Sequence, residues 1–424
     1  MIEMLTFIFI VIICCARSHA IDLNHVTNVL SEPSNTLNFL AGFTSLTSSL
    51  SSLTSALSNV TGELPDSTTI QLCFMTTPQM ITYYGYVVVE FEVTTDDGYI
   101  LTIFYMYSSK YVNDTLTPII LQPGMYDDTD SLCIHPYSLA YYLADRGYRV
   151  ALYNPRGNSY SLDHETLDSS IPDGPYWGFT WYEMGIYDLP ATINKVLSIT
   201  GAKRVSLIGH SEGGTIIFVL LSERPEFNGV VKFFACMAPF TFMKNVGFPI
   251  NAALKLVHLY NGNRNFSFVQ NTPAQRAASL FFCTMANGEI CNTVINSIYG
   301  PSVGQRDAAS NALFPCHWPA GGSFGQIYLF SDEYAKKYFG HMNADGSHSD
   351  FILRNINTTF AVFYSSNDPH TNQNDVDSLY NSTPSVITKI FQNIPQFNHI
   401  DFLFAKTAPE LVYNRIVTIE LSIP

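Results

Sequence analysis

A serine between two glycines, flanked by two apolar runs, constrains the fold of this chain more than any other feature. Val205–Ile208 is a short apolar run that predicts a buried strand, and Thr215–Leu221, with the two residues after it, is long enough for a helix. Between the two runs stands Gly209-His-Ser-Glu-Gly213, a match to G-x-S-x-G. In that motif a sharp turn raises a serine hydroxyl above the end of a sheet, and a side chain at either glycine would collide with the neighbouring strand or helix. The alternative is a glycine-rich connection without chemistry, and the flanking strand and helix argue against it.

Strands and helices alternate on both sides of this unit. The strands that we expect are Val87–Thr94, Tyr99–Met106, Ile119–Gln122, Arg149–Tyr153, Val231–Cys236, Phe360–Tyr364 and Val386–Phe391. The expected helices are Tyr137–Arg146, Tyr187–Thr200, Asp375–Tyr380 and Ala408–Thr418. This alternation predicts an α/β fold with a mostly parallel central sheet and helices on both faces.

The alternation stops between residues 238 and 330. This segment is rich in aromatic and other large apolar residues and lacks clear strand patterns. We expect it to form a mainly helical cap or lid, inserted between core segments 71–237 and 331–424. An apolar cap over a serine site would line a substrate pocket and exclude water from it. The alternative is the ordinary packing of a helical subdomain.

The N-terminal region differs in composition from the rest. Residues 4–15 form an apolar block too short to span a bilayer, and Ser18-His-Ala20 supplies small residues for cleavage, so we predict a signal peptide over residues 1–20. Residues 21–70 form a Ser/Thr/Leu-rich extension, which we interpret as a flexible tail or a removable segment. The alternative is a short amphipathic helix, because four leucines would share one helical face: Leu46, Leu50, Leu53 and Leu57.

Export through the secretory pathway, to the exterior or to a lysosome-like lumen, permits disulfides and glycosylation. Cleavage would leave six cysteines, of which Cys283 and Cys291 are the preferred pair because they close a small loop. The pairing of the other four stays open: Cys73, Cys133, Cys236 and Cys316. Five Asn-x-Ser/Thr sequons predict N-glycosylation, at Asn59, Asn113, Asn265, Asn357 and Asn381.

The acidic net charge and the low share of charged residues indicate which kinds of partner the protein can bind. The net charge of −14 argues against nucleic acid, whose phosphates favour basic proteins. Only 13% of the residues are charged, whereas the chain has 25 Tyr and 30 Phe, a composition that suits an enzyme acting on apolar material. No obligatory protein partner follows from the sequence.

A serine nucleophile needs a base to take its proton and a third group to orient that base. In the α/β-hydrolase arrangement the acid and the histidine follow the serine in that order, in loops at the carboxyl ends of later strands. Asp368 follows the Phe360–Tyr364 strand, and His399 follows the Val386–Phe391 strand. We therefore predict a triad of Ser211 as nucleophile, Asp368 as acid and His399 as base.

Other side chains compete for these roles. His370 stands two residues from Asp368, too close to reach back to it easily, and His210 is expected to pack beside the serine turn. Asp375 and Asp377 fall on an expected helix, where solvated charges are typical, and Asp401 is expected in a loop or at the start of a helix.

The tetrahedral intermediate of ester hydrolysis needs backbone N–H donors. One donor is expected to be the amide of Glu212, directly after the nucleophile, and the other the amide of Met125, in the loop after the Ile119–Gln122 strand. Pro123 in the same loop has no N–H to give. We predict no metal site, because the polar stretch with His341, Asp345, His348 and Asp350 is typical of a surface loop.

Several stretches together resemble the acid lipase family, the animal gastric and lysosomal lipases with their insect and nematode relatives. The resemblance runs from about Thr76 to the C-terminus. The stretches that carry it are Thr94–Leu101, Leu139–Tyr148, Asn154–Asn158, Glu183–Ile193, Gly209–Gly213, His317–Ser323 and Asn398–Phe402.

The resemblance implies an α/β-hydrolase core with a mostly helical cap. It also implies a secreted or lysosomal-type serine lipase that hydrolyses triacylglycerol-like neutral lipids at an interface, without a cofactor. Steryl esters or short-chain esters are the alternative substrates, and a catalytically impaired lipid-binding or storage protein is the alternative from another class. The triad and oxyanion residues proposed above match the family's positions, and Cys283 and Cys291 resemble the disulfide of the gastric members.

Two positions and one stretch of the cap, around Asn261–Gly304, depart from the family's pattern. The family usually has glutamine after the serine, where this chain has Glu212, and a carboxylate near a developing oxyanion is unfavourable unless it is protonated or turned away. The family's His-Gly-Leu in the oxyanion strand is replaced by Pro123-Gly-Met125.

Overall fold

The computed structural model describes residues 66–284, 288–384 and 387–424. The predicted signal peptide, Asn59 and all of the predicted extension except residues 66–70 lie outside the described residues. Helix α4 (Ser67–Phe74) begins within that last part of the predicted extension. Among the described residues, no helix is both long enough and apolar enough to cross a membrane.

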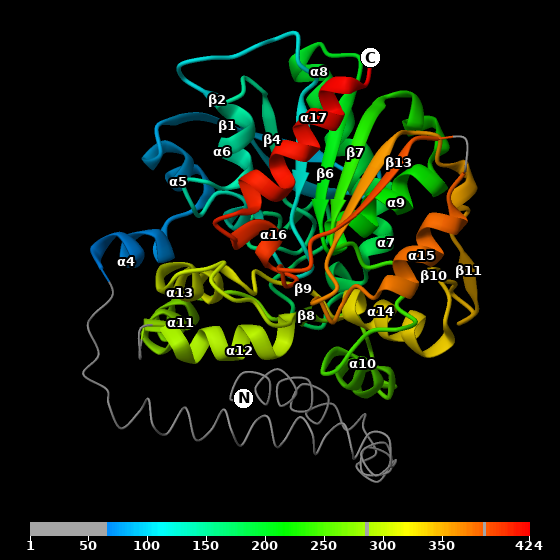
Figure 1. Cartoon of the computed structure of the whole chain (residues 1–424). Coiled ribbons are helices and arrows are strands. Elements are labelled where there is room, and N and C mark those ends of the chain that lie inside the picture. The colour runs from blue at the N-terminus through cyan, green and yellow to red at the C-terminus, as the bar shows by residue number, and fades with distance from the viewer. Residues whose placement is uncertain (1–65, 285–287, 385–386) are drawn as a thin grey trace.

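A nine-stranded sheet forms the centre of the described chain (Figure 1). Its order is β1-β2-β4-β3-β6-β7-β12-β13, with β5 beside β2. The first two strands and β4 pair in antiparallel fashion, and every pairing from β4 to β13 is parallel, which confirms the predicted fold class. The strands are β1 Tyr86–Thr94, β2 Tyr99–Ser108, β3 Ile119–Gln122, β4 Val150–Tyr153, β5 Asp163–His164, β6 Val205–His210, β7 Val231–Met237, β12 Phe360–Tyr364 and β13 Lys389–Asn393.

Side chains of the central strands alternate between two hydrophobic cores, one on each face of the sheet. On β3, for example, Ile120 joins one core, whereas Ile119 and Leu121 join the other. Strand neighbours point to opposite faces, so a strand buried on both sides reads as a continuous apolar run. The first core holds helices α8 (Leu189–Thr200) and α9 (Glu212–Glu223), and the second holds α6 (Leu139–Ala144) and α17 (Asn414–Ser422).

The segment expected to form the cap is mainly helical. Figure 1 shows α10 to α13 gathered beyond one end of the central sheet. The helices are α10 Ile250–His258, α11 Pro273–Thr284, α12 Glu289–Tyr299, α13 Ala308–His317 and α14 Phe324–Lys336. Helix α14 continues past residue 330, where the sequence analysis put the end of the cap, and the domain limits remain predictions.

Some element boundaries differ from the sequence-based expectation. The helix expected from Tyr187 begins as α8 at Leu189, after a π-helical turn over Met184–Asp188, and the last strand covers Lys389–Asn393. The closing helix consists of a π-helical turn over Pro409–Tyr413 and α17. The remaining short elements are α5 Thr77–Tyr83, α7 Trp181–Glu183, α15 Gln373–Ser382, α16 Asp401–Phe404, and the strand pairs β8 Ser267–Phe268 with β9 Gly322–Ser323 and β10 Gly340–Met342 with β11 His348–Asp350.

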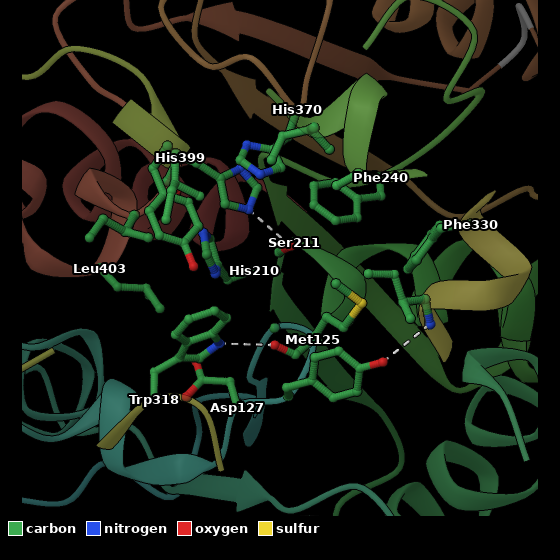
Figure 2. A pocket seen from close by; sticks show the side chains of 18 of the residues that line it. Met125, Asp127, His210, Ser211, Phe240, Trp318, Phe330, His370, His399 and Leu403 are labelled. Carbon is green, nitrogen blue, oxygen red and sulfur yellow. Dashed lines mark hydrogen bonds between the residues drawn. The ribbon is translucent and has the colours of Figure 1, made fainter. Parts of the chain in front are cut away.

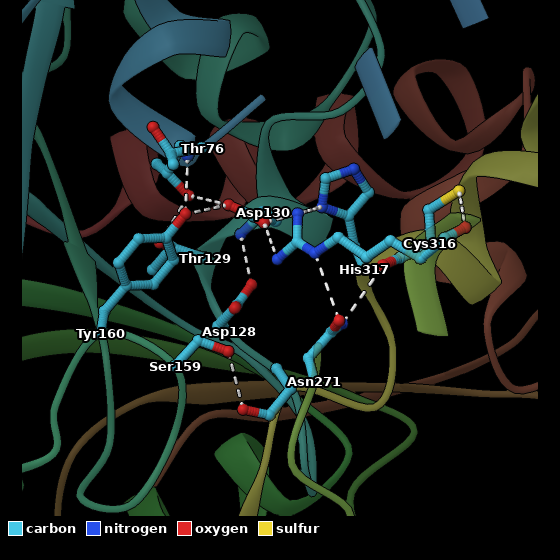
Figure 3. A network of polar contacts seen from close by, with 12 residues as sticks. Thr76, Asp128, Thr129, Asp130, Ser159, Tyr160, Asn271, Cys316 and His317 are labelled. Carbon is cyan, nitrogen blue, oxygen red and sulfur yellow. Dashed lines mark hydrogen bonds and ion pairs between the residues drawn. The ribbon is translucent and has the colours of Figure 1, made fainter. Parts of the chain in front are cut away.

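A disulfide attaches helix α4 to the cap, and a buried polar network lies next to it. Cys73 is bonded to Cys316 of α13. Next to it, Asp130 accepts hydrogen bonds from Thr77 and Tyr160, both at 2.6 Å, and contacts the Nδ1 atom of His317 at 2.7 Å (Figure 3). Burial works to raise the pKa of Asp130, but the charge and the hydrogen bonds of its partners, led by His317, lower it overall. The carboxylate therefore joins the N-terminal helices, the core and the cap.

Candidate active site

Ser211 lies in the sharp turn between β6 and α9, as the motif predicts. Its backbone has φ 54° and ψ −124°, an unfavourable conformation for a residue with a side chain. A Cβ atom at Gly209 would overlap the backbone of Gly213, and one at Gly213 would overlap the carbonyl oxygen of Pro123. Both glycines are therefore needed for the turn to form.

The three side chains predicted as a triad meet at this turn. The Nε2 atom of His399 lies 3.0 Å from the Oγ atom of Ser211, and its Nδ1 atom lies 2.7 Å from Oδ2 of Asp368 (Figure 2). All three residues are buried, with exposed fractions between 3% and 5%. Burial would raise the pKa of Asp368, but the charge and hydrogen bonds of its histidine neighbours, His399 first among them, hold it well below its usual range. Asp368 is therefore a carboxylate at neutral pH.

The loops that carry the acid and the base are fixed by neighbouring elements. Asp368 follows β12, in a turn closed by a hydrogen bond from its own N–H to the Ser365 carbonyl (3.2 Å). The backbone N–H of His399 donates to the Tyr299 carbonyl at the end of α12 (3.0 Å), and the Nε2 atom of His210 lies 2.8 Å from the His399 carbonyl oxygen. His210 thus packs beside the turn, and burial lowers its pKa to about 3, which keeps its ring neutral.

His370 reaches Asp368, contrary to the expectation that it stands too close in sequence, although His399 is the ring that contacts Ser211. Its backbone N–H donates to Oδ1 of Asp368 at 2.8 Å, and its Nδ1 atom lies 3.0 Å from the same oxygen. A histidine two residues after an aspartate reaches the carboxylate here because the chain bends at Pro369 and His370. Asp368 therefore contacts two imidazole rings.

The other acids considered in the sequence lie away from the serine. Asp375 is buried, contrary to expectation, and accepts hydrogen bonds from the backbone and side chain of Asn245 (2.9 and 2.7 Å). Asp377 is exposed on α15, and Asp401 is the first residue of α16, where it forms a buried ion pair with Arg306.

Metal-binding side chains come together at one place in the described chain. Ligand atoms of Asp368, His370 and His399 lie within 4.8 Å of one another. Each of the two Nδ1 atoms is at hydrogen-bond distance from a different carboxylate oxygen, so proton bridges account for this spacing. Residues 341–350 form the β10–β11 hairpin and make no comparable cluster within the described residues.

The predicted oxyanion donors flank the serine. Glu212 is the first residue of α9, and Met125 lies in the loop after β3 and lines the cavity with Ser211. The loop is fixed because Trp318, at the end of α13, donates its indole N–H to the Met125 carbonyl oxygen (3.2 Å; Figure 2). No local pattern indicates this contact, since 193 residues separate its partners.

The Glu212 side chain turns into the protein, where it contacts the cap. Gln326 of α14 donates its amide N–H to Oε1 of Glu212 (2.8 Å), and its own carbonyl oxygen accepts the N–H of Ser323 (2.9 Å). Among the described residues, Oε2 of Glu212 has no hydrogen-bond partner, and the residue is 1% exposed. Burial raises its pKa to about 8, with the Gln326 hydrogen bond opposing this. Glu212 is therefore neutral at and below neutral pH, which removes the repulsion anticipated from the sequence.

We expect Glu212→Gln to change the pH dependence of stability. In the folded chain Glu212 keeps its proton up to about pH 8, whereas the unfolded chain releases it near the ordinary pKa of a glutamate, 4.5. Its contribution to the free energy of unfolding is therefore full below about pH 4.5 and declines as the pH rises towards 8. The variant should match the native protein at about pH 4 and exceed it by on the order of 4 kcal/mol at about pH 8.

Thermal unfolding of both proteins across this range measures the effect. The Glu212→Gln variant should still show part of the native pH dependence, since burial also raises the pKa of Asp127 to about 7. Parallel curves for the variant and the native protein would show that Glu212 is ionised in the fold.

An apolar cavity of about 150 Å³ opens above the serine. Its walls come from the cap helices α10, α12, α13 and α14 and from α16 of the core, and they include Ile250, Leu254, Ile298, Phe314, Phe330 and Leu403. His399 and His370 also line it. The cavity can hold a hydrocarbon chain beside the serine hydroxyl, away from water.

The disulfide prediction is confirmed for Cys283 and Cys291, which are bonded. Cys73 pairs with Cys316, and Cys133 and Cys236 are buried thiols. Of the sequon asparagines, Asn113 is partly exposed, and Asn265, Asn357 and Asn381 are exposed. Their glycosylation remains a prediction.

Comparisons with known proteins agree with this geometry. Residues 77–135 match the model of a partial α/β-hydrolase lipase region, and residues 117–284 match that of the α/β-hydrolase fold. Lipase 1 of Drosophila melanogaster is 30% identical over 365 residues, which cover 82% of this chain and 80% of that protein. Human gastric triacylglycerol lipase is 30% identical over 368 residues, which cover 81% and 90%.

Among solved structures, a soluble variant of monoglyceride lipase from Saccharomyces cerevisiae shares the fold. Its TM-score is 0.53 and its identity 17%, over 79% of this chain and 95% of that one. The chain therefore belongs to the α/β-hydrolase lipase family that includes the gastric lipases, and it is a carboxylic ester hydrolase.

Proposed function

We propose that the protein hydrolyses triacylglycerol-like neutral lipids through an acyl-enzyme on Ser211. The observation that carries this proposal is the continuous chain of contacts from Ser211 through His399 to Asp368, beneath an apolar cavity. A protein that only stored lipid would need the cavity but not the three aligned polar groups. Relatives that include gastric triacylglycerol lipase support this choice of substrate.

The reaction follows from the geometry. His399 takes the hydroxyl proton of Ser211 at Nε2 while the Oγ atom attacks the ester carbonyl, and Asp368 stabilises the imidazolium that forms. The amides of Met125 and Glu212 stabilise the oxyanion. His399 then gives the proton to the departing alcohol, and water releases the fatty acid from the acyl-enzyme by the same steps. These steps need no cofactor.

The protein is proposed to work at a lipid interface after passing through the secretory pathway. The predicted signal peptide, the two disulfides and the accessible sequons support this setting. Nucleic acid is not a proposed partner, given the net charge of −14, and no protein partner is required.

Fatty-acid release from three substrates tests the proposal. We expect the purified protein to cleave a triacylglycerol emulsion with at least about tenfold higher kcat/KM than a steryl ester or a soluble short-chain p-nitrophenyl ester. A fluorescent alkyl phosphonate, which reacts with activated serines, should label the same protein stoichiometrically. Preference for the steryl or the short-chain ester would show that the substrate is not a triacylglycerol. The absence of both labelling and turnover would reject the proposed enzymatic activity.

A further inference from the structure

Asp368 holds two imidazole rings, one on each carboxylate oxygen. Oδ2 contacts Nδ1 of His399 (2.7 Å), and Oδ1 accepts the backbone N–H of His370 (2.8 Å) and contacts Nδ1 of its ring (3.0 Å). The carboxylate is fully buried, and the His370 residue is 7% exposed. The mechanism above uses only the first of these contacts.

Two aromatic residues stack on both histidines, and Figure 2 shows one of them, Phe240, beside the two imidazole rings. Phe240 stacks on His370 at a centroid distance of 5.5 Å, and Tyr299 of α12 stacks on it at 5.5 Å from a different element. The same two residues stack on His399, at 5.1 and 6.0 Å, and the two imidazole centroids are 4.4 Å apart. His370 therefore has a fixed ring plane in a site shielded from water.

The charge state of His370 follows from this enclosure. Burial and the neighbouring charge of His399 lower its pKa to about 4, against the opposing effect of Asp368. The ring is thus neutral over most of the pH range and carries one proton. Because Nδ1 faces a carboxylate oxygen, that proton is on Nδ1 and is donated to Oδ1.

Resting on the proposed function, we propose that His370 is a positioning residue for ester hydrolysis. Its Nδ1–H holds Oδ1 of Asp368, which prevents the carboxylate from rotating about its Cβ–Cγ bond and keeps Oδ2 directed at His399. A buried carboxylate held at one oxygen only by a backbone N–H would tilt more freely, and a small misalignment of a catalytic hydrogen bond lowers the rate strongly. The Nδ1 atom of His370 contacts Asp368, whereas the ring that contacts Ser211 is that of His399.

Two substitutions test separately the hydrogen-bond donor of His370 and the packing of its ring. His370→Asn keeps an N–H near the position of Nδ1 but loses the ring, whereas His370→Phe keeps a ring between Phe240 and Tyr299 but loses the donor. We expect His370→Phe to lower kcat for a soluble p-nitrophenyl ester by about 10- to 100-fold, with KM within about threefold of native. His370→Asn should keep kcat within about threefold of native.

Rates are expressed per serine titrated to completion with the phosphonate, so that they refer to folded molecules only, and thermal unfolding is recorded for each variant. Native-like kcat in His370→Phe would overturn the inference. Equal losses in both variants would overturn it too, because the ring's packing would then be the cause. Failure of the proposed function would be distinguishable from failure of this inference. In that case the native protein itself would neither hydrolyse the ester nor react with the phosphonate.

Discussion

Replacement of Ser211 by alanine is expected to lower kcat for ester hydrolysis by roughly 10⁵-fold or more. Without the Oγ atom no acyl-enzyme forms, and the residual rate is that of water attack assisted by the oxyanion donors alone. The change removes one oxygen atom from a turn whose strained backbone is held by the glycines on either side, so the melting temperature should stay at or above the native value.

Ester turnover and phosphonate labelling measure this loss. Ser297→Ala is the matched control, because Ser297 is an exposed serine on cap helix α12 that bonds only to the Thr293 carbonyl oxygen of its own helix. It should retain native activity and labelling. If Ser211→Ala keeps a substantial part of the native rate with a native melting temperature, another nucleophile is at work.

Replacement of Asp368 by asparagine is expected to lower kcat by about 10⁴-fold, with little effect on KM. Oδ1 accepts two hydrogen bonds from His370, so the asparagine carbonyl should occupy that place and turn its NH₂ group towards His399. An N–H donor at that position forces His399 into the tautomer with its proton on Nε2, which cannot accept a proton from Ser211.

A control variant makes this prediction specific to the position of Asp368. Asp377→Asn is the same chemical change at an exposed site on α15 and should leave the rate unchanged. A kcat for Asp368→Asn within about tenfold of native would mean that another group orients His399.

The central elements of the fold were predictable because their physical signals are local. The apolar runs on either side of Ser211 must form a strand and a helix, and the glycines of the turn leave room for backbone atoms that a Cβ atom would overlap. The positions of Asp368 and His399 followed from chain order and from the rule that loops at the carboxyl ends of parallel strands meet. The structure brings these two side chains to the serine.

The remaining contacts depend on distances in space that no local pattern records. The Cys73–Cys316 bond joins residues 243 positions apart, and the Gln326–Glu212 pair joins residues 114 positions apart. His370 was misjudged because sequence proximity to Asp368 suggested that it could not reach the carboxylate, whereas the bend at Pro369 and His370 allows it. Burial of Asp375 was missed because a helix pattern of mostly polar residues gave no sign of Asn245.

Helix α14 links substrate recognition to the oxyanion site, and this has a consequence for protein engineering. Its Phe330 lines the cavity, while its Gln326 is paired with Glu212 in the serine turn. A chimera that takes this helix from a relative would change the cavity wall and would also leave the buried Glu212 carboxyl group without its hydrogen-bond donor. Lid and residue 212 must therefore be exchanged together, with glutamine at 212 if the incoming helix offers no amide donor. Recombination libraries that break the gene between these two positions should yield folded but poorly active progeny.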